Sequence, residues 1–155
     1  MILGIREDRD NQLDRAAAMP HRKTAGIDPL DARLESTVGR LFLNGLISES
    51  QYDAGLKYGR IILDYLESIE APQPYGNVDS SRAIEDDKCF KRKLSACQAR
   101  EIIKRAAQWH SLRVTSVIAV VDDLAVYGIA PDLNDPRAWR RLRVGLSALA
   151  GDGFK

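Results

Sequence analysis

The sequence predicts an all-α protein, built as a helical hairpin followed by a C-terminal three-helix unit, with about five to six helices in total. Apolar residues recur at three- and four-residue spacing through most of the 155 residues, which is the period of one buried helix face. Helix-start signals precede these periodic segments, and glycine or proline follows them. A composition of 45% hydrophobic and 29% charged residues is ordinary for a globular domain.

Residues 1–27 are expected to form an N-terminal helix or arm. The stretch from Arg6 to Ala18 is typical of a short polar helix, which a proline soon ends. The rest of the chain, 28–155, is expected to form a single helical domain. Its expected parts are a helical hairpin (28–70), a loop (71–83) marked by prolines and glycine, and a basic helical unit (84–155).

The first helix of the hairpin is predicted to begin at Asp28-Pro29, because aspartate suits the N-cap and proline suits the first helical position. Asn44-Gly45 is a typical C-terminal stop. The apolar stripe between these signals has helical spacing and consists of Leu30, Leu34, Val38, Leu41 and Phe42.

The second helix is predicted to open with a capping box at Ser48–Gln51 and to run to about Glu70. Gly55 and Gly59 lie on its buried side, where they either allow another helix backbone to come close or are tolerated without a role. The side chains expected to be buried are Tyr52, Leu56, Ile62, Leu63, Leu66 and Ile69.

These two helices have the order of a helix-turn-helix. A recognition helix presents its first residues to an anionic groove, and here those residues include Glu49 and Asp53. Because phosphates would repel two carboxylates, a structural hairpin is the favoured interpretation.

Residues from about Ile84 to His110 are predicted to form the third long helix. One of its apolar faces consists of Phe90, Leu94 and Cys97. A second, rotated face consists of Ile103, Ala106 and Trp109. The change of face suggests a bend or a register change near Ala99.

The most apolar segment, from Leu112 to Tyr127, is rich in β-branched residues and could form a strand. Helical spacing of its apolar residues favours a buried helix that ends at Gly128. The final helix is predicted to begin at Asn134-Asp135-Pro136 and to end at Gly151. Its buried side consists of Trp139, Leu142, Leu146 and Leu149, and its opposite side carries Arg137, Arg140 and Arg141, with Arg143 near the boundary.

The sequence contains no glycine-rich phosphate loop, nucleophile elbow or zinc-protease motif. Asp122-Asp123 is an adjacent carboxylate pair, but neighbours on a helix point about 100° apart and do not converge on one ion. We expect one of them to face water and the other to cap a helix or pair with an arginine. No enzyme activity, metal site or cofactor is expected.

No apolar stretch is long enough to span a bilayer, and the N-terminus lacks the basic start and long apolar run of a signal peptide. We therefore expect no membrane partner and a cytoplasmic location. Cys89 and Cys97 are expected to be reduced, because two cysteines in a chain of this size do not make a disulfide scaffold.

Charge is distributed unevenly along the chain: residues 1–81 have a net charge of −4 and residues 82–155 a net charge of +5. Such asymmetry favours a polyanionic partner, here duplex DNA, although a solvated surface face is the ordinary alternative. The residues predicted to contact DNA are Arg137, Arg140 and Arg141 on the final helix, with Lys91, Arg92, Lys93, Lys104 and Arg105 holding the backbone.

Two blocks of sequence carry a family resemblance. The first is Gly39-Arg40-Leu41-x-Leu43-x-Gly45-Leu46-Ile47-Ser48-x-x-Gln51-Tyr52-x-Ala54-Gly55-x-x-Tyr58, and the second is Leu142-Arg143-x-Gly145-Leu146-x-Ala148-Leu149-Ala150. They resemble a family of small helical proteins of α-proteobacterial genomes and prophages, some of them described as helix-turn-helix proteins. In that family a fuller helix-turn-helix precedes the final helix, whereas this chain has only the connection 129–135.

The resemblance implies a phage-associated DNA-binding regulator, and we expect a homodimer, or more generally a homo-oligomer, that contacts duplex DNA. Two alternatives remain open. One is a phage DNA-packaging protein similar to a terminase small subunit, which would form a large closed ring. The other is a protein-binding inhibitor or anti-host module that uses the acidic hairpin to hold a host protein partner.

Overall fold

The computed structural model describes residues 14–15, 17–20, 27–28, 30–70 and 81–151. Within the last of these ranges it describes the side chains from residue 87 onward. The elements, in order, are η2 (Ala32–Glu35), α2 (Thr37–Leu43), α3 (Glu49–Glu70), α4 (Ser81–Trp109), α5 (Val114–Ala125) and α6 (Pro136–Leu149). Every regular element in these ranges is helical, which confirms the all-α class. Most of the predicted N-terminal helix and of the loop 71–83 lies outside the described residues.

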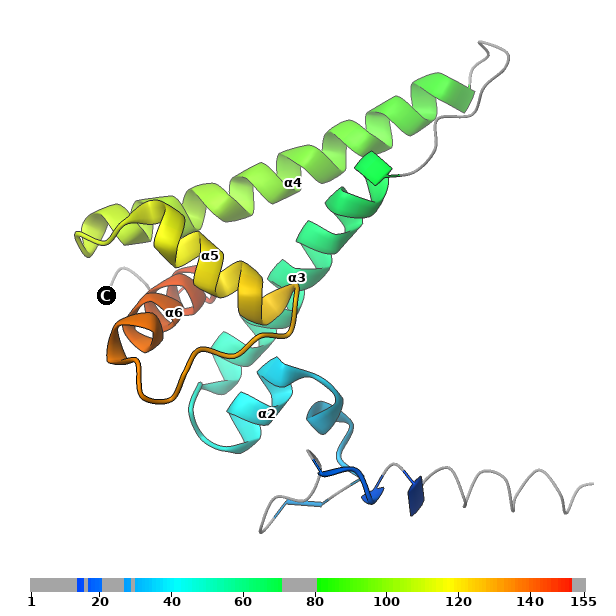
Figure 1. The fold of residues 1–155 in the computed structure, drawn as a ribbon. Coiled ribbons are helices and arrows are strands. Elements are labelled where there is room, and N and C mark those ends of the chain that lie inside the picture. Colours follow the sequence, from blue (N-terminus) through cyan, green and yellow to red (C-terminus); the bar gives the residue numbers. More distant parts are fainter. Residues whose placement is uncertain (1–13, 16, 21–26, 29, 71–80, 152–155) are drawn as a thin grey trace, which may run out of the picture.

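The two longest helices, α3 and α4, form a V in Figure 1, with α5 and α6 filling the space where they diverge. Helix α6 contacts α3, α4 and α5, and α5 also contacts α3 and α4. The short helix α2 packs near the start of α3. One apolar core therefore joins the helical hairpin to the C-terminal helices, and α6 occupies its centre.

The first helix of the hairpin was predicted to begin at Asp28-Pro29 and to continue to Asn44, and this prediction is wrong. The chain instead forms η2 and then α2, with a break at Ser36. The Ser36 hydroxyl accepts a hydrogen bond of 2.9 Å from the Gly39 N–H, which makes it the N-cap of α2. Asp31, rather than Asp28, caps η2. Leu30, expected in the apolar stripe, is exposed, whereas Leu34, Val38 and Leu41 are buried.

The connection from α2 to α3 follows the sequence signals closely. Gly45 has a φ of 70°, and Leu46 donates to the Leu41 carbonyl at 2.9 Å, which closes α2 with a Schellman motif. Ser48 and Gln51 then form the predicted capping box, in which each backbone N–H donates to the other residue's side chain, at 3.0 and 3.3 Å.

Helix α4 runs continuously from Ser81 to Trp109, so the two predicted faces belong to one helix without a break. Ile103 and Ala106 face the core, whereas Phe90, Leu94 and Cys97 lie on the solvent side. The apolar face formed by Phe90, Leu94 and Cys97 is therefore not a core face. On α3 the burial predicted for Leu56, Leu63 and Ile69 is wrong, because all three are exposed. Trp109, predicted on the same apolar face as Ile103, is also exposed.

Glycines set the close packing of the later helices. A Cβ at Gly59 would overlap the Ala125 carbonyl, and one at Gly145 would come within 2.5 Å of the Val121 side chain. The close approach predicted at Gly59 is thus confirmed, and α5 is the helix that approaches. The segment predicted as a strand or a buried helix is helix α5, with Val117, Val121 and Leu124 buried.

No helix in the described part of the chain is long and apolar enough to cross a membrane.

Candidate nucleic-acid interface

Helix α6 is firmly anchored at its N-terminus. The Asp135 carboxylate accepts hydrogen bonds from the N–H groups of Arg137 and Ala138, at 2.9 and 3.1 Å, and Pro136 occupies the first turn. Trp139, the fourth residue of α6, is buried, and its indole N–H donates to the Asp132 carbonyl at 3.0 Å. These contacts fix both the direction and the rotation of α6 against the core.

Four arginines occur within seven positions of this anchored helix, and none of them enters the core. Arg137, Arg140 and Arg143 are exposed and Arg141 is half-buried, which confirms the predicted buried and basic sides of the helix. Helical spacing places Arg137 beside both Arg140 and Arg141, and Arg140 beside Arg143. The guanidinium groups therefore cover one side of α6 from its first turn to its middle.

These arginines have no ion pair among the described residues. The nearest carboxylates along the chain serve the backbone instead, since Asp132 accepts from the Asn134 N–H and Asp135 caps the helix. The described part of the chain thus provides no carboxylate that pairs with the positive charge of α6.

The basic residues of α4 are in a different situation. Lys91 forms an ion pair with Asp87 at 2.7 Å, and Glu101 contacts both Lys104, at 3.2 Å, and Arg105, at 3.5 Å. The hydrogen bond from Lys104, followed by the charges of Lys104 and Arg105, lowers the pKa of Glu101. Three of the five predicted α4 contacts therefore share their charge with a carboxylate, and acid-to-base spacing of three or four residues was the signal for this.

The five cations also do not lie on one side of α4. Successive residues are rotated by about 100°, so Lys93 and Lys104 share the side of Arg100, while Lys91 and Arg105 point away from the core. Arg92 is on the core side but exposed, because the buried part of the helix starts at Ala96. Arg92 and Lys93 form no ion pair within the described residues.

Arg100 has a structural role. Its guanidinium forms an ion pair with Asp122 of α5 at 3.0 Å, and the Tyr58 hydroxyl of α3 donates to the same carboxylate at 2.5 Å. Asp123 is exposed, so the interpretation of the carboxylate pair is confirmed: one faces water and the other holds an arginine. Burial, and then the hydrogen bond to Asp122, raise the pKa of Tyr58 above the ordinary tyrosine range.

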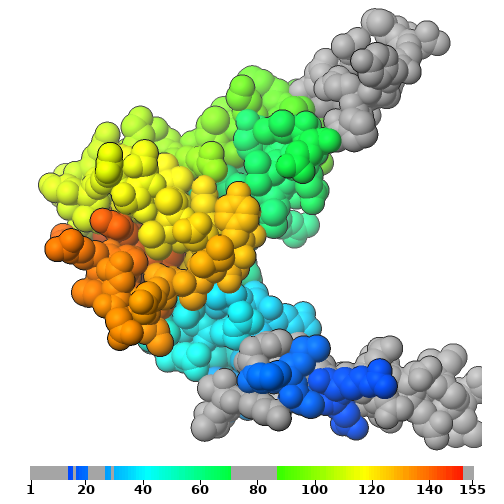
Figure 2. Space-filling view, viewed as in Figure 1, coloured from blue at the N-terminus to red at the C-terminus, as the bar shows by residue number. Residues whose placement is uncertain are grey.

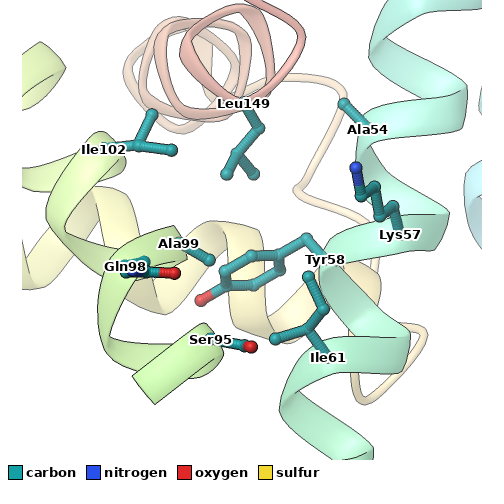
Figure 3. Close-up of a pocket in the computed structure, with 9 residues that line it drawn as sticks. All are labelled: Ala54, Lys57, Tyr58, Ile61, Ser95, Gln98, Ala99, Ile102 and Leu149. Carbon is teal, nitrogen blue, oxygen red and sulfur yellow. The ribbon is translucent and has the colours of Figure 1, made fainter. Parts of the chain in front are cut away.

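A pocket of about 260 Å³ lies beside Tyr58, between α3, α4 and the end of α6 (Figure 3). Its lining contains one cation, Lys57, and no carboxylate, histidine or cysteine. The lining residues are Ala54, Lys57, Tyr58, Ile61, Ser95, Gln98, Ala99, Ile102 and Leu149. Elsewhere in the described residues no group of three metal-ligating side chains comes together.

Comparison of the chain with protein-family models, with curated proteins and with solved structures finds no match.

Proposed function

We propose that the chain is a DNA-binding regulatory protein of phage type, which contacts duplex DNA through α6. The observation that carries this proposal is the set of four arginines on α6, which have no carboxylate partner within the described part of the chain. The phage and regulatory parts of the proposal rest on the family resemblance, and a cytoplasmic location follows from them.

Arginine on a rigid helix suits an anionic duplex. Guanidinium groups bind phosphates through two parallel hydrogen bonds and can also reach guanine edges in the major groove, which is about 12 Å wide and admits a helix. The caps at Asp135 and the anchor at Trp139 hold these side chains on a fixed scaffold. Binding therefore costs little ordering of the backbone.

The α2–α3 hairpin is a poorer surface for DNA, because Glu49 and Asp53 are exposed near the start of α3. Of the five cations predicted as contacts on α4, Arg92 and Lys93 are exposed without an ion pair among the described residues and would hold the phosphate backbone as auxiliary contacts. Lys91, Lys104 and Arg105 contribute less, since Asp87 and Glu101 neutralise part of their charge.

A binding assay on duplex DNA at low salt tests the proposal. The first variant, Arg137→Ala/Arg140→Ala/Arg141→Ala, removes three charges from α6. The matched control, Arg92→Ala/Lys93→Ala/Lys104→Ala, removes three charges from α4. We expect the α6 variant to lose at least about tenfold in affinity and the α4 variant to lose clearly less.

Failure of the wild-type protein to bind duplex DNA at low salt would contradict the proposal. Equal losses in both variants would show that the charge of the chain, rather than α6, determines binding. Thermal unfolding of each variant checks that the half-buried Arg141 can be replaced without loss of the fold.

A further inference from the structure

The pocket between α3, α4 and α6 lies on a seam between two helices that their side chains leave incompletely filled. Its lining residues are Ala54, Lys57, Tyr58 and Ile61 on α3 and Ser95, Gln98, Ala99 and Ile102 on α4. On each helix these are the first, fourth, fifth and eighth positions of one face, which is the spacing by which helices pack together. Ala54, Ser95 and Ala99 are small, and α3 and α4 diverge toward this end (Figure 1), so a space of about 260 Å³ remains.

The lining side chains point into this space from all three helices. In Figure 3, Leu149 enters it from α6, Gln98 and Ile102 enter from α4, and the ring of Tyr58 enters from α3. Ile61, Ile102, Leu149 and the tyrosine ring make most of the lining apolar. Ile102 is 40% exposed and Leu149 is half-buried, so both retain apolar surface that a ligand would remove from water.

The pocket is accessible without movement of a helix. Lys57, Ser95 and Gln98 belong to its lining and are exposed. On the face of the molecule shown in Figure 2, α5 (yellow) occupies the space between α4 and α3. No residue of α5 lines the pocket, so a ligand can enter past the three exposed side chains without displacing α5.

The polar groups of the lining favour an anion. Lys57 is its one charged residue and has no ion pair within the described part of the chain. The Gln98 amide has no hydrogen-bond partner among the described residues and can donate one to a ligand. The other two donors are already in use, since the Tyr58 hydroxyl donates to Asp122 and the Ser95 hydroxyl donates to a backbone carbonyl at 3.1 Å.

We propose that this pocket binds a small carboxylic acid with an apolar body. The carboxylate lies against the Lys57 ammonium group with the Gln98 amide as a second donor, and the apolar body fills the space between Tyr58, Ile102 and Leu149. A single negative charge matches the single cation, whereas a phosphate ester would carry more charge than the lining neutralises. A cavity of about 150 Å³ holds benzene, so this pocket suits a ligand of about ten non-hydrogen atoms.

This site is separate from the proposed DNA contact. None of the residues predicted to contact DNA lines the pocket, and its cation, Lys57, belongs to α3. Binding of the acid is therefore measured on the full chain alone, and failure of either proposal leaves the other intact.

Isothermal titration calorimetry with octanoate and with 3-phenylpropionate tests the proposal, because both combine one carboxylate with an apolar body of this size. We expect at least one acid to bind with one molecule per chain and a dissociation constant below about 1 mM. Octanoate tests a flexible chain and 3-phenylpropionate a ring, and binding of either supports the proposal. The corresponding alcohols, octan-1-ol and 3-phenylpropan-1-ol, lack the charge and should bind more weakly. Absence of binding by both acids overturns the proposal, as does an alcohol that binds as tightly as its acid.

The role of Lys57 is tested by Lys57→Met, which removes the charge and keeps an unbranched side chain. This variant should bind the acid about three- to tenfold more weakly and the alcohol as the wild type does, so the preference for the acid should disappear. Lys93→Met makes the same change on the side of α4 opposite the pocket and should leave the binding of both compounds unchanged. An unaltered preference for the acid in Lys57→Met would show that Lys57 does not hold the carboxylate.

The position of the ligand is tested by Ser95→Leu, which fills the pocket from α4. Ser95 is exposed and leucine is the better helix former, so thermal unfolding should occur at or above the wild-type temperature, while binding of both acid and alcohol should be lost. Cys97→Leu, turned about 160° away on the same helix and also exposed, is the matched control and should bind as the wild type does. Binding of the acid to a folded Ser95→Leu chain with wild-type affinity would place the ligand elsewhere and overturn the proposal.

Discussion

The hydroxyl of Tyr58 on α3 lies 2.5 Å from a carboxylate oxygen of Asp122 on α5, and the other oxygen of that carboxylate holds Arg100 of α4 at 3.0 Å. One aspartate thus joins the three helices against which α6 packs. Tyr58 is almost completely buried, so its hydroxyl depends on this carboxylate for a partner. The network fixes the relative positions of α3, α4 and α5, and therefore also the surface against which α6 packs.

Replacement of Asp122 by alanine should lower the free energy of unfolding by about 2 kcal/mol, because it leaves a buried hydroxyl and an arginine without their partner. The neighbouring variant Asp123→Ala is the matched control, since Asp123 is exposed, and we expect a change within about 0.5 kcal/mol. Urea unfolding measures both. Equal effects of the two variants would show that the network does not hold the helices together.

Stability should fall in alkaline solution through Tyr58. Burial and the Asp122 carboxylate raise the pKa of this hydroxyl in the folded chain, so above the ordinary tyrosine pKa of about 10 the native state holds more protons than the unfolded state. Its contribution is therefore fully present below about pH 10 and is lost as the pH rises further. Urea unfolding of wild type and Tyr58→Phe at about pH 8 and pH 11 should show their difference in stability shrinking at the higher pH. A constant difference would contradict this.

The contact between α5 and α6 should tolerate no added methyl group at Gly145. A Cβ there would lie 2.5 Å from Val121 and 3.3 Å from Val117, so Gly145→Ala should destabilise the fold by about 1–3 kcal/mol despite the better helix propensity of alanine. The double variant Gly145→Ala/Val121→Ala makes room for the methyl group and should lose less than the sum of the two single variants. Simple additivity in thermal unfolding would argue against this contact.

Ser111 ends α4 in a left-handed backbone conformation, with a φ of 54°. Leu112 donates to the Ala107 carbonyl at 2.8 Å, so Ser111 occupies the position where glycine is usual. Ser111→Gly should raise the free energy of unfolding by up to about 1 kcal/mol, because glycine adopts this conformation without strain. Ser116→Gly, within α5, should lower it by a similar amount. A change of the same sign in the free energy of unfolding of both variants would contradict the left-handed conformation assigned to Ser111.

Local signals predicted the helices well, because they act over a few residues. The capping box at Ser48, the stop at Gly45 and the start at Asp135 are all present. The break at Ser36 was not predicted, because two helix-start signals, Asp28 and Ser36, occur within nine residues. The later signal acts as the N-cap, since the Ser36 hydroxyl accepts a hydrogen bond from the Gly39 N–H. Burial was harder to predict: the face of Phe90 and Leu94 has the spacing of a core face, but α4 is long enough to present two apolar sides.

Of the two predicted basic clusters, the one on α6 lies on one side of its helix as predicted, and the one on α4 does not. The α6 arginines follow from one helical period and one capping signal, and the structure places them as expected. The run of cations on α4 appeared continuous in sequence, but the helix distributes it around its circumference and Asp87 and Glu101 neutralise part of it. The Tyr58 contact with Asp122 joins residues 64 positions apart, which no local pattern could indicate.

The salt dependence of DNA binding tests the central claim most directly. Each phosphate contact adds about 0.9 to the slope of log affinity against log salt concentration, measured between about 50 and 200 mM salt. If α6 holds the duplex, Arg137→Ala/Arg140→Ala/Arg141→Ala should reduce that slope by about two to three units relative to wild type. Parallel lines for the two proteins, or a wild-type affinity that does not change with salt, would show that these arginines do not contact DNA.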